Sequence, residues 1–143
     1  MPFDTVFSAA STAAMAGWIA LILLPRWPLL IAVLRHALIG LLSALYASLI
    51  FVYFFRVEGG GFGSIGEVRA LFASDPVLVA GWVHYLAFDL FIGSWIAVEA
   101  DSRGFNRVLQ APILVATFMF GPLGLLLFYV TAAVQSALPT GKA

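Results

Sequence analysis

Residues 76–98 form an apolar stretch in which His84 and Asp89 carry the only acidic or basic side chains. As a helix, these residues would extend about 34 Å at ~1.5 Å per residue, which is enough to cross a bilayer. Ionisable side chains at that depth are costly, so they usually face other protein segments or a wet cavity and often carry function. The stretch therefore predicts a transmembrane helix that bears a candidate site.

The composition excludes a soluble domain. Hydrophobic residues make up 63% of the chain and charged residues 10%, whereas charged residues make up about a quarter of a soluble domain. Seven basic residues balance seven acidic ones, so the chain has no basic surface for nucleic acid. The absence of cysteine excludes disulfides, thiolate nucleophiles and metal sites that use sulfur. These features indicate an integral membrane protein that does not bind nucleic acid.

The apolar runs predict an all-α, polytopic membrane protein with four transmembrane helices in a single domain, residues 1–143. The first run ends where Pro25 and Pro28 break the helix. The second is placed between Arg35 and Arg56, and the apolar residues before Arg35 are expected to form an interfacial lead-in or an extra turn and a half. The four spans are expected at about residues 5–24, 36–55, 76–98 and 108–134.

The fourth span contains Pro122, which cannot donate a backbone hydrogen bond and therefore predicts a kink at mid-membrane. The polar connector before the third span contains Ser64 and Glu67 at the spacing of a capping box. A short amphipathic helix is therefore expected at the membrane surface between the second and third spans. Two interpretations of that helix remain open: a plain linker, or a lid over a substrate entrance.

Four spans place both termini on the same side of the membrane. Because the first and third turns carry more cationic residues than the opposite side, the positive-inside rule predicts outward termini. The N-terminal stretch has no basic residue before its apolar run, so it is expected to be a retained helix and not a cleaved signal. With no organelle-targeting sequence before it, the chain is expected to be a bacterial protein or a mature form, and the bacterial inner membrane is the expected location.

Helical periodicity divides the polar and aromatic side chains of the third span between two faces. At about 100° per residue, Trp82, Tyr85 and Asp89 fall along one stripe. His84 and Trp95 fall along another, with His84 about 140° from Asp89 around the helix. Both ionisable groups are expected to face inward, and to line one cavity if the third helix is central.

Depth along the predicted helices, at ~1.5 Å per residue, indicates which side chains from other helices accompany these two groups. Asp89 is expected in the same layer as Thr117, and His84 in the same layer as Tyr46. His36 falls more than about 10 Å from the layer of His84, so the two histidines cannot bind one iron or one haem within a subunit. No metal site is therefore predicted.

The segment Trp82-Val-His84-Tyr-Leu-Ala-Phe-Asp89-Leu-Phe91, with Gly121-Pro122-Leu-Gly124 after it, resembles the abscisic-acid-deficient-4-like family of small integral membrane proteins. Residues 7–11 and 72–75 fit the same family, so the resemblance covers most of the chain. Plant members are associated with the formation of neoxanthin from violaxanthin, an isomerisation that opens a carotenoid epoxide. The resemblance therefore implies a carotenoid or other isoprenoid lipid as substrate and no cofactor, although the glycine-rich connector departs from the plant members.

The resemblance implies that His84 and Asp89 act as acid and base in opening a xanthophyll epoxide, in either order. The side chains expected to hold the substrate are Trp82, Tyr85, Trp95, Tyr46 and Thr117. Two other functions remain open: a non-catalytic carotenoid or lipid binder that assembles with carotenoid-pathway enzymes, and a small proton-relay or transport protein that uses His84 and Asp89. A homo-oligomer with a pocket shared between subunits also fits four short spans.

Overall fold

The computed structural model describes residues 2–137, which are helical throughout apart from short connections and contain no strand. The predicted all-α fold is therefore confirmed. The chain divides into two compact units, Met1–Leu90 and Phe91–Ala143, and helix α5 contributes to both. The elements are α1 (Phe3–Leu23), α2 (Pro28–Ala32), η1 (Val33–Leu38), α3 (Ile39–Tyr53), η2 (Phe54–Arg56), α4 (Ile65–Phe72), α5 (Asp75–Ser102), α6 (Arg107–Phe120) and α7 (Pro122–Ala137).

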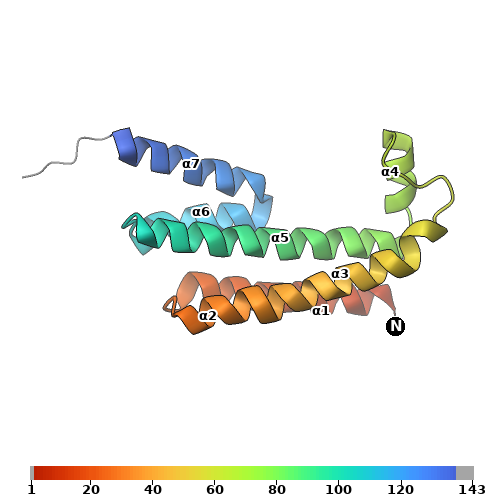
Figure 1. Cartoon of the computed structure of the whole chain (residues 1–143), viewed down its shortest axis with the longest axis horizontal. Helices are drawn as coiled ribbons and strands as arrows, with labels where there is room; N and C mark the ends of the chain where they lie inside the picture. The colour runs from red at the N-terminus through yellow and green to blue at the C-terminus, as the bar shows by residue number, and fades with distance from the viewer. Residues whose placement is uncertain (1, 138–143) are drawn as a thin grey trace, which may run out of the picture. The chain divides into compact units, whose positions relative to one another are not determined.

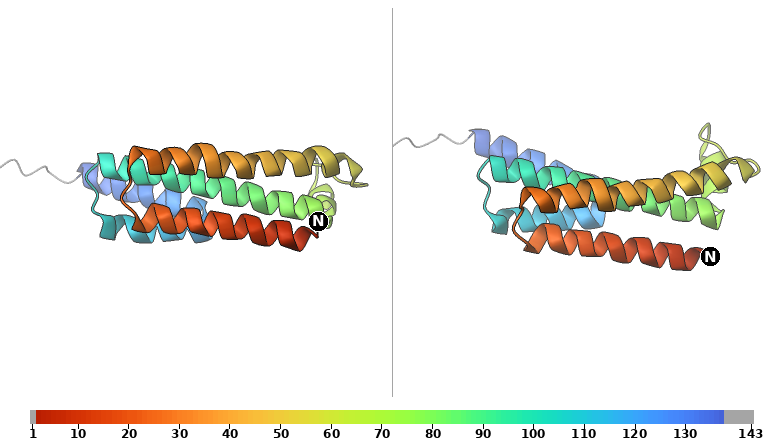
Figure 2. Two further views of the ribbon diagram at one scale, coloured as in Figure 1. Left: turned by 90° about the horizontal axis from the view of Figure 1, so that it is seen from below. Right: turned by 60° about the horizontal axis from the view of Figure 1, so that its bottom comes forward.

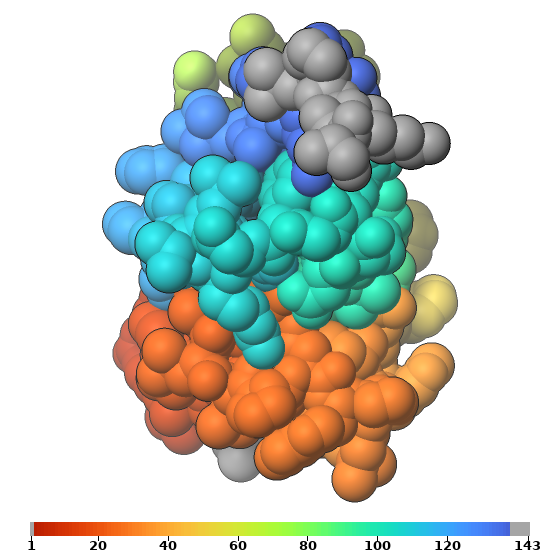
Figure 3. Space-filling model, turned by 90° about the vertical axis from the view of Figure 1, so that its left-hand side faces the viewer, coloured from red at the N-terminus to blue at the C-terminus, as the bar shows by residue number. Residues whose placement is uncertain are grey.

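Three helices of the described chain are long and apolar enough to cross a membrane: Phe3–Leu23, Pro28–Arg56 and Asp75–Ser102, with 21, 29 and 28 residues. The first and third agree with the predicted spans within a few residues at each end. The turn between the first two forms part of the molecular surface (orange in Figure 3), and its Trp27 is 60% exposed. An aromatic side chain in that position is typical of a membrane interface.

The second long helix begins at Pro28, eight residues before the predicted start of the second span. Proline is favoured at this first position because its missing N–H would have no helical partner there. The apolar residues before Arg35 are therefore helical, as the alternative of an extra turn and a half predicts. Arg35 and His36 lie in the π-helical turn η1, and the helix continues through this polar pair without a break.

In the first unit, α1 and α3 run side by side in opposite directions (Figures 1 and 2). Gly17 of α1 permits the close approach of η1, which leads into α3, and of α5. A Cβ atom at this position would lie 2.6 Å from Leu38 Cδ2 and 3.0 Å from Leu90 Cδ2, so only glycine fits without movement of those leucines. Ala14 and Leu21, which are fully buried, extend the same packed face of α1.

Helix α4 begins with the predicted capping interaction, in which the Ser64 hydroxyl accepts a hydrogen bond from the Glu67 backbone N–H at 3.2 Å. The Glu67 carboxylate accepts from the N–H of Gly63 at 2.8 Å, one residue earlier than a standard capping box places it. Leu71 is the buried residue of this helix, whereas Ile65 is 78% exposed. A position of α4 at the membrane surface stays a prediction.

The second unit differs most from the predicted arrangement, because no single helix covers residues 108–134. The chain reverses direction at Gly121, and α6 and α7 pack against each other as a hairpin (Figure 1). Their 14 and 16 residues extend about 21 and 24 Å, which is less than the ~30 Å of a bilayer core. The expected mid-membrane kink is therefore a complete turn.

Two glycines make this turn possible. Gly121 has a φ angle of 47°, a backbone conformation that side chains other than glycine's disfavour, and Pro122 then starts the new helix. Gly124 lies directly against Thr117, and a Cβ atom there would collide with the threonine hydroxyl and backbone. The Thr117 hydroxyl donates back to the Ile113 carbonyl at 2.8 Å, so it adds no unpaired polar group to this contact.

The open end of the hairpin is fixed to the turn after α5. Gln110 is 1% exposed, and its amide donates to Asp101 at 2.8 Å and to the Phe105 carbonyl at 2.7 Å. Gln135 near the end of α7 donates to the Arg103 carbonyl at 3.0 Å. The last described turn of α7 therefore returns to the place where α6 begins.

Candidate functional site

One face of α5 carries an aromatic and hydroxyl cluster shared with α1. The Trp82 indole N–H donates to the Ser11 hydroxyl at 2.9 Å, and the Phe7 ring lies 5.2 Å from the Trp82 ring. Because Phe7 and Ser11 are one helical turn apart, α1 presents both to the same indole. Tyr85, on the next turn of α5, lies with its ring 5.3 Å from Trp82. The hydrogen bond and ring contacts fix the orientation of Trp82.

Asp89 lies one turn beyond Tyr85 on this face and is buried, with 9% of its surface exposed. The Tyr85 hydroxyl makes a side-chain hydrogen bond with the Asp89 carboxyl group. The other carboxyl oxygen, Oδ2, is buried and has no hydrogen-bond partner within the described chain. Buried polar atoms are nearly always paired, so this oxygen is a candidate for hydrogen bonding to a bound molecule.

His84 belongs to a different part of the first unit. Its ring lies 5.4 Å from the Tyr46 ring of α3 and stacks on Phe88 at 4.4 Å with an angle of 18°. The predicted common layer of His84 and Tyr46 is therefore confirmed. His84 is exposed and does not face inward as predicted; it lines a groove of about 290 Å³ together with Tyr46.

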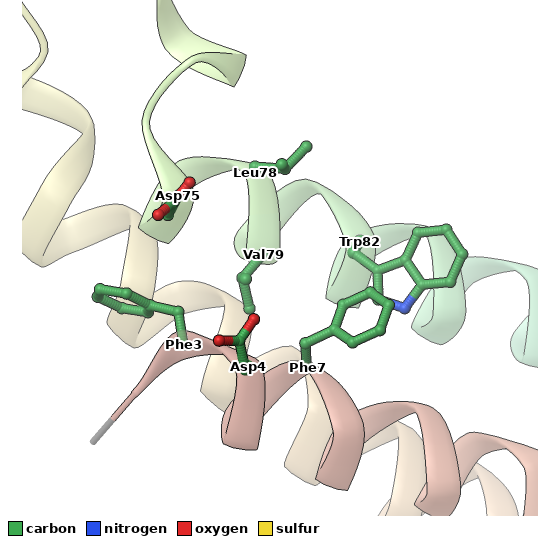
Figure 4. A pocket seen from close by; sticks show the side chains of 7 residues that line it. All are labelled: Phe3, Asp4, Phe7, Asp75, Leu78, Val79 and Trp82. Carbon is green, nitrogen blue, oxygen red and sulfur yellow. The ribbon is translucent and has the colours of Figure 1, made fainter.

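A larger cavity lies between the first turns of α1 and α5 (Figure 4). Its volume is about 480 Å³, within the range of small-molecule sites. The Phe7 and Trp82 rings face each other on one side of it, and Asp4 and Asp75 bring carboxylates from the two helices. Its lining consists of Phe3, Asp4, Phe7, Asp75, Leu78, Val79 and Trp82.

Two further cavities, of about 410 and 390 Å³, lie along α1. Neither these nor the two cavities above count Asp89 among their lining residues. None of these four cavities therefore supports the expectation that His84 and Asp89 line one cavity. The first unit instead places Asp89 with Tyr85 and His84 with Tyr46.

Trp95 and Thr117, both predicted to hold substrate, lie in the second unit. The Trp95 ring packs edge-on against Phe128 at 5.5 Å and lies 6.3 Å from Tyr129. Thr117 is fully buried at the contact between α6 and α7. Both side chains therefore contribute to hairpin packing, and a role in binding substrate stays a prediction.

Sequence reasoning did not select Phe7 and Ser11 as site residues, although both lie in a segment that resembles the family. The available signal was their spacing of one turn in an otherwise apolar helix, which places a ring and a hydroxyl on one face. Their partner Trp82 is 71 positions further along the chain, and periodicity within one helix carries no information about such a pairing. A pairing of this kind requires the packing of α1 against α5.

The polar groups assembled here are proton donors and acceptors beside aromatic rings. Within residues 2–137, no three or more histidine, aspartate or glutamate side chains come together in a way that could hold a metal ion. On one face Asp89 offers a carboxyl group held by Tyr85, and in the groove His84 and Tyr46 offer an imidazole and a phenol. Such groups suit proton transfer and the binding of an oxygen-bearing apolar molecule.

Comparison with known proteins gives one match. A family model described as ABA DEFICIENT 4-like matches residues 5–128. The match extends over most of the chain and includes both the Asp89 face and the His84 groove. No curated protein and no solved structure matches the chain.

Proposed function

Because the chain belongs to the ABA DEFICIENT 4-like family, which associates it with the carotenoid and abscisic acid pathway, we propose that it isomerises an epoxide-bearing xanthophyll within the membrane. The observation that carries the proposal is the buried Asp89 carboxyl group, one oxygen of which has no partner within the described chain. Ionisable side chains inside a membrane protein are energetically costly, and those that occur there usually have a function. The three long apolar helices supply the membrane setting.

Opening an epoxide to an allene requires two proton movements and no electrons. A proton is delivered to the epoxide oxygen as one carbon–oxygen bond breaks, and a proton is removed from the polyene carbon that becomes part of the allene. The product has the same composition as the substrate, and the epoxide oxygen becomes a hydroxyl group. An acid and a base are therefore sufficient.

Asp89 is suited to both steps. In its protonated form the carboxyl group donates through Oδ2, the oxygen without a partner, to the epoxide oxygen. The resulting carboxylate then accepts the proton from carbon and returns to its starting form. Tyr85 keeps the carboxyl group oriented through its hydrogen bond. We assign both steps to Asp89, whereas the sequence-based hypothesis divided them between Asp89 and His84, because His84 lies in the separate groove with Tyr46.

The aromatic cavity between α1 and α5 supports the same function. Phe7 and Trp82 present their rings toward each other at the side of α5 that continues through Tyr85 to Asp89. Rigid aromatic surfaces bind a flat polyene by stacking and dispersion at little entropic cost. The hydrogen bond that the Trp82 indole N–H donates to the Ser11 hydroxyl holds this surface in place.

Expression of the full chain in bacteria that accumulate an epoxide-bearing xanthophyll tests the proposal. We expect a new pigment of unchanged mass, separable from the substrate by chromatography and carrying an allene. Extracts that contain only the original pigment, with the protein present in the membrane, would contradict an isomerase for that class of substrate.

A non-catalytic carotenoid binder is the second candidate. It is favoured by the finding that none of the four cavities described above is lined by Asp89, although two of them are lined by aromatic side chains. In the same experiment, a binder would co-purify with unaltered pigment. The two candidates therefore differ in whether the bound pigment is converted.

A further inference from the structure

We propose that the groove beside His84 is a second ligand site, which binds the oxygen-bearing end group of an isoprenoid lipid through His84 and Tyr46. The proposal rests on the proposed function for the class of lipid, but it assigns this groove to recognition and not to proton transfer. The groove lies wholly within the first unit and draws on α3, η2, the connector, α4 and α5. Its lining consists of Tyr46, Ile50, Phe54, Phe62, Leu71, Phe72, Val77, Gly81 and His84.

The polar groups of the groove require a partner. His84 lies about 14 Å along α5 from its first residue, inside the apolar span. The contacts of the His84 ring are with the rings of Tyr46 and Phe88, which leaves its nitrogens and the Tyr46 hydroxyl without hydrogen bonds to the described chain. Because the bilayer core offers no water to satisfy such groups, an oxygen atom of a bound lipid is the partner that the surroundings can supply.

The size of the groove indicates how much of a lipid it holds. Its volume of about 290 Å³ corresponds to roughly ten water molecules at ~30 Å³ each. That space accommodates a ring-sized end group, and the rest of a long polyene must extend out of it. Since a phenol and an imidazole both donate and accept hydrogen bonds, a hydroxyl oxygen on that end group satisfies both of them.

The connector and α4 provide a roof for this groove. Phe62 of the connector stacks on Phe54 with ring centroids 5.3 Å apart. Phe72 of α4 lies over Gly81, where a Cβ atom would be only 2.6 Å from Phe72 Cε1. Gly81 therefore allows the aromatic roof to lie close to α5. Of the two interpretations left open for the amphipathic helix, this arrangement supports the lid.

A binding experiment on the full chain in lipid nanodiscs tests the proposal. The probes are zeaxanthin, which has a hydroxyl group on each end ring, and β-carotene, which differs by lacking them; neither has an epoxide to react. We expect zeaxanthin to bind about 10-fold more tightly, as gained hydrogen bonds predict, measured by quenching of tryptophan fluorescence. In the double variant Tyr46→Phe/His84→Leu the two affinities should become equal, with the affinity for β-carotene unchanged.

Glycine variants provide a matched control for the groove itself. Gly81→Ala displaces Phe72 and should weaken binding of both pigments. Gly40→Ala also adds one methyl group to a helix, but its Cβ meets nothing within 4 Å, so binding should be as in the wild type. Equal affinities for both pigments in the wild type, or a preference that survives in the double variant, would overturn the proposal.

Asp89→Asn separates this proposal from the proposed function. We expect the variant to keep the preference for zeaxanthin, because Asp89 does not line the groove. If the preference is lost in Asp89→Asn, the groove is not a separate site. If the wild type discriminates between the two pigments and yet converts no epoxide, the groove is supported and the isomerase is not.

Discussion

Asp89→Asn is expected to reduce pigment conversion by at least about 100-fold, the lower end of what a general acid–base group contributes. The substitution removes the transferable proton but keeps the shape of the side chain and an oxygen that accepts from Tyr85. The free energy of unfolding should therefore change by less than about 1 kcal/mol. The measurements are pigment analysis of cell extracts and denaturation of the purified protein in detergent.

Stability distinguishes a functional aspartate from a structural one. The double variant Asp89→Leu/Tyr85→Phe removes the buried carboxyl group together with its hydrogen-bond donor. Because one carboxyl oxygen has no partner within the described chain, we expect this variant to be more stable by about 1–3 kcal/mol, and inactive. Glu58→Gln, which removes an exposed carboxylate from the connector, should leave both activity and stability unchanged. A lower free energy of unfolding in the double variant than in the wild type would indicate that Asp89 has a structural role.

The second prediction with a large expected effect concerns the membrane topology of the chain, that is, which residues lie on which side of the bilayer. With three crossing helices followed by a hairpin that returns to its starting point, Ser136 and Ser102 should lie on the same side of the membrane and Glu58 on the other. Wild-type protein contains no cysteine, so each single variant, Ser102→Cys, Ser136→Cys or Glu58→Cys, carries one thiol. A membrane-impermeant maleimide applied to sealed vesicles should label the first two variants from one side and the third only from the other.

Four complete spans predict a different pattern. Ser136→Cys would then react from the same side as Glu58→Cys, and the hairpin would not describe the protein in its membrane. The sequence-based expectation that both termini face outward requires four spans, so the three-span labelling pattern would contradict it; the bacterial inner membrane stays a prediction. Labelling of intact cells alongside the vesicles shows which side of the membrane is the outside. The C-terminus itself, residues 138–143, lies outside the described chain.

Much of the first unit could be predicted because its signals are local. The length of each apolar run fixed the existence of the three long helices, and Pro25 with Pro28 fixed the turn between the first two. The spacing of Ser64 and Glu67 was sufficient for the start of α4. Depth along two helices placed Tyr46 in the same layer as His84, and the two rings lie 5.4 Å apart.

The hairpin could not be predicted from Pro122 alone. A proline inside an apolar run usually bends a helix, and a full reversal depends in addition on the positive φ of Gly121 and on the contact of Gly124 with Thr117. The second glycine was visible in the sequence, but its partner was not. A 27-residue apolar run reads as one span when the close approach of its two halves is unknown.

The candidate site was predicted in its residue types and less well in its grouping. Trp82, Tyr85 and Asp89 share a face because helical geometry requires it, and the structure adds Phe7 and Ser11 from α1. His84 was expected to face inward because it is costly in a membrane, and it is exposed instead, beside Tyr46 and beneath the aromatic roof. Burial of a particular side chain depends on how neighbouring helices pack against it. Periodicity within one helix carries no information about that packing.

Conversion by the purified protein tests the central claim most directly. The full chain in nanodiscs is incubated with an epoxide-bearing xanthophyll deuterated at the polyene carbon next to the epoxide-bearing ring, without added cofactor. Proton transfer by Asp89 predicts an allenic product that has lost that one deuterium and is otherwise of the same composition. A pigment that stays bound with its epoxide and deuterium intact, or a product with a gained or lost oxygen, would contradict the account.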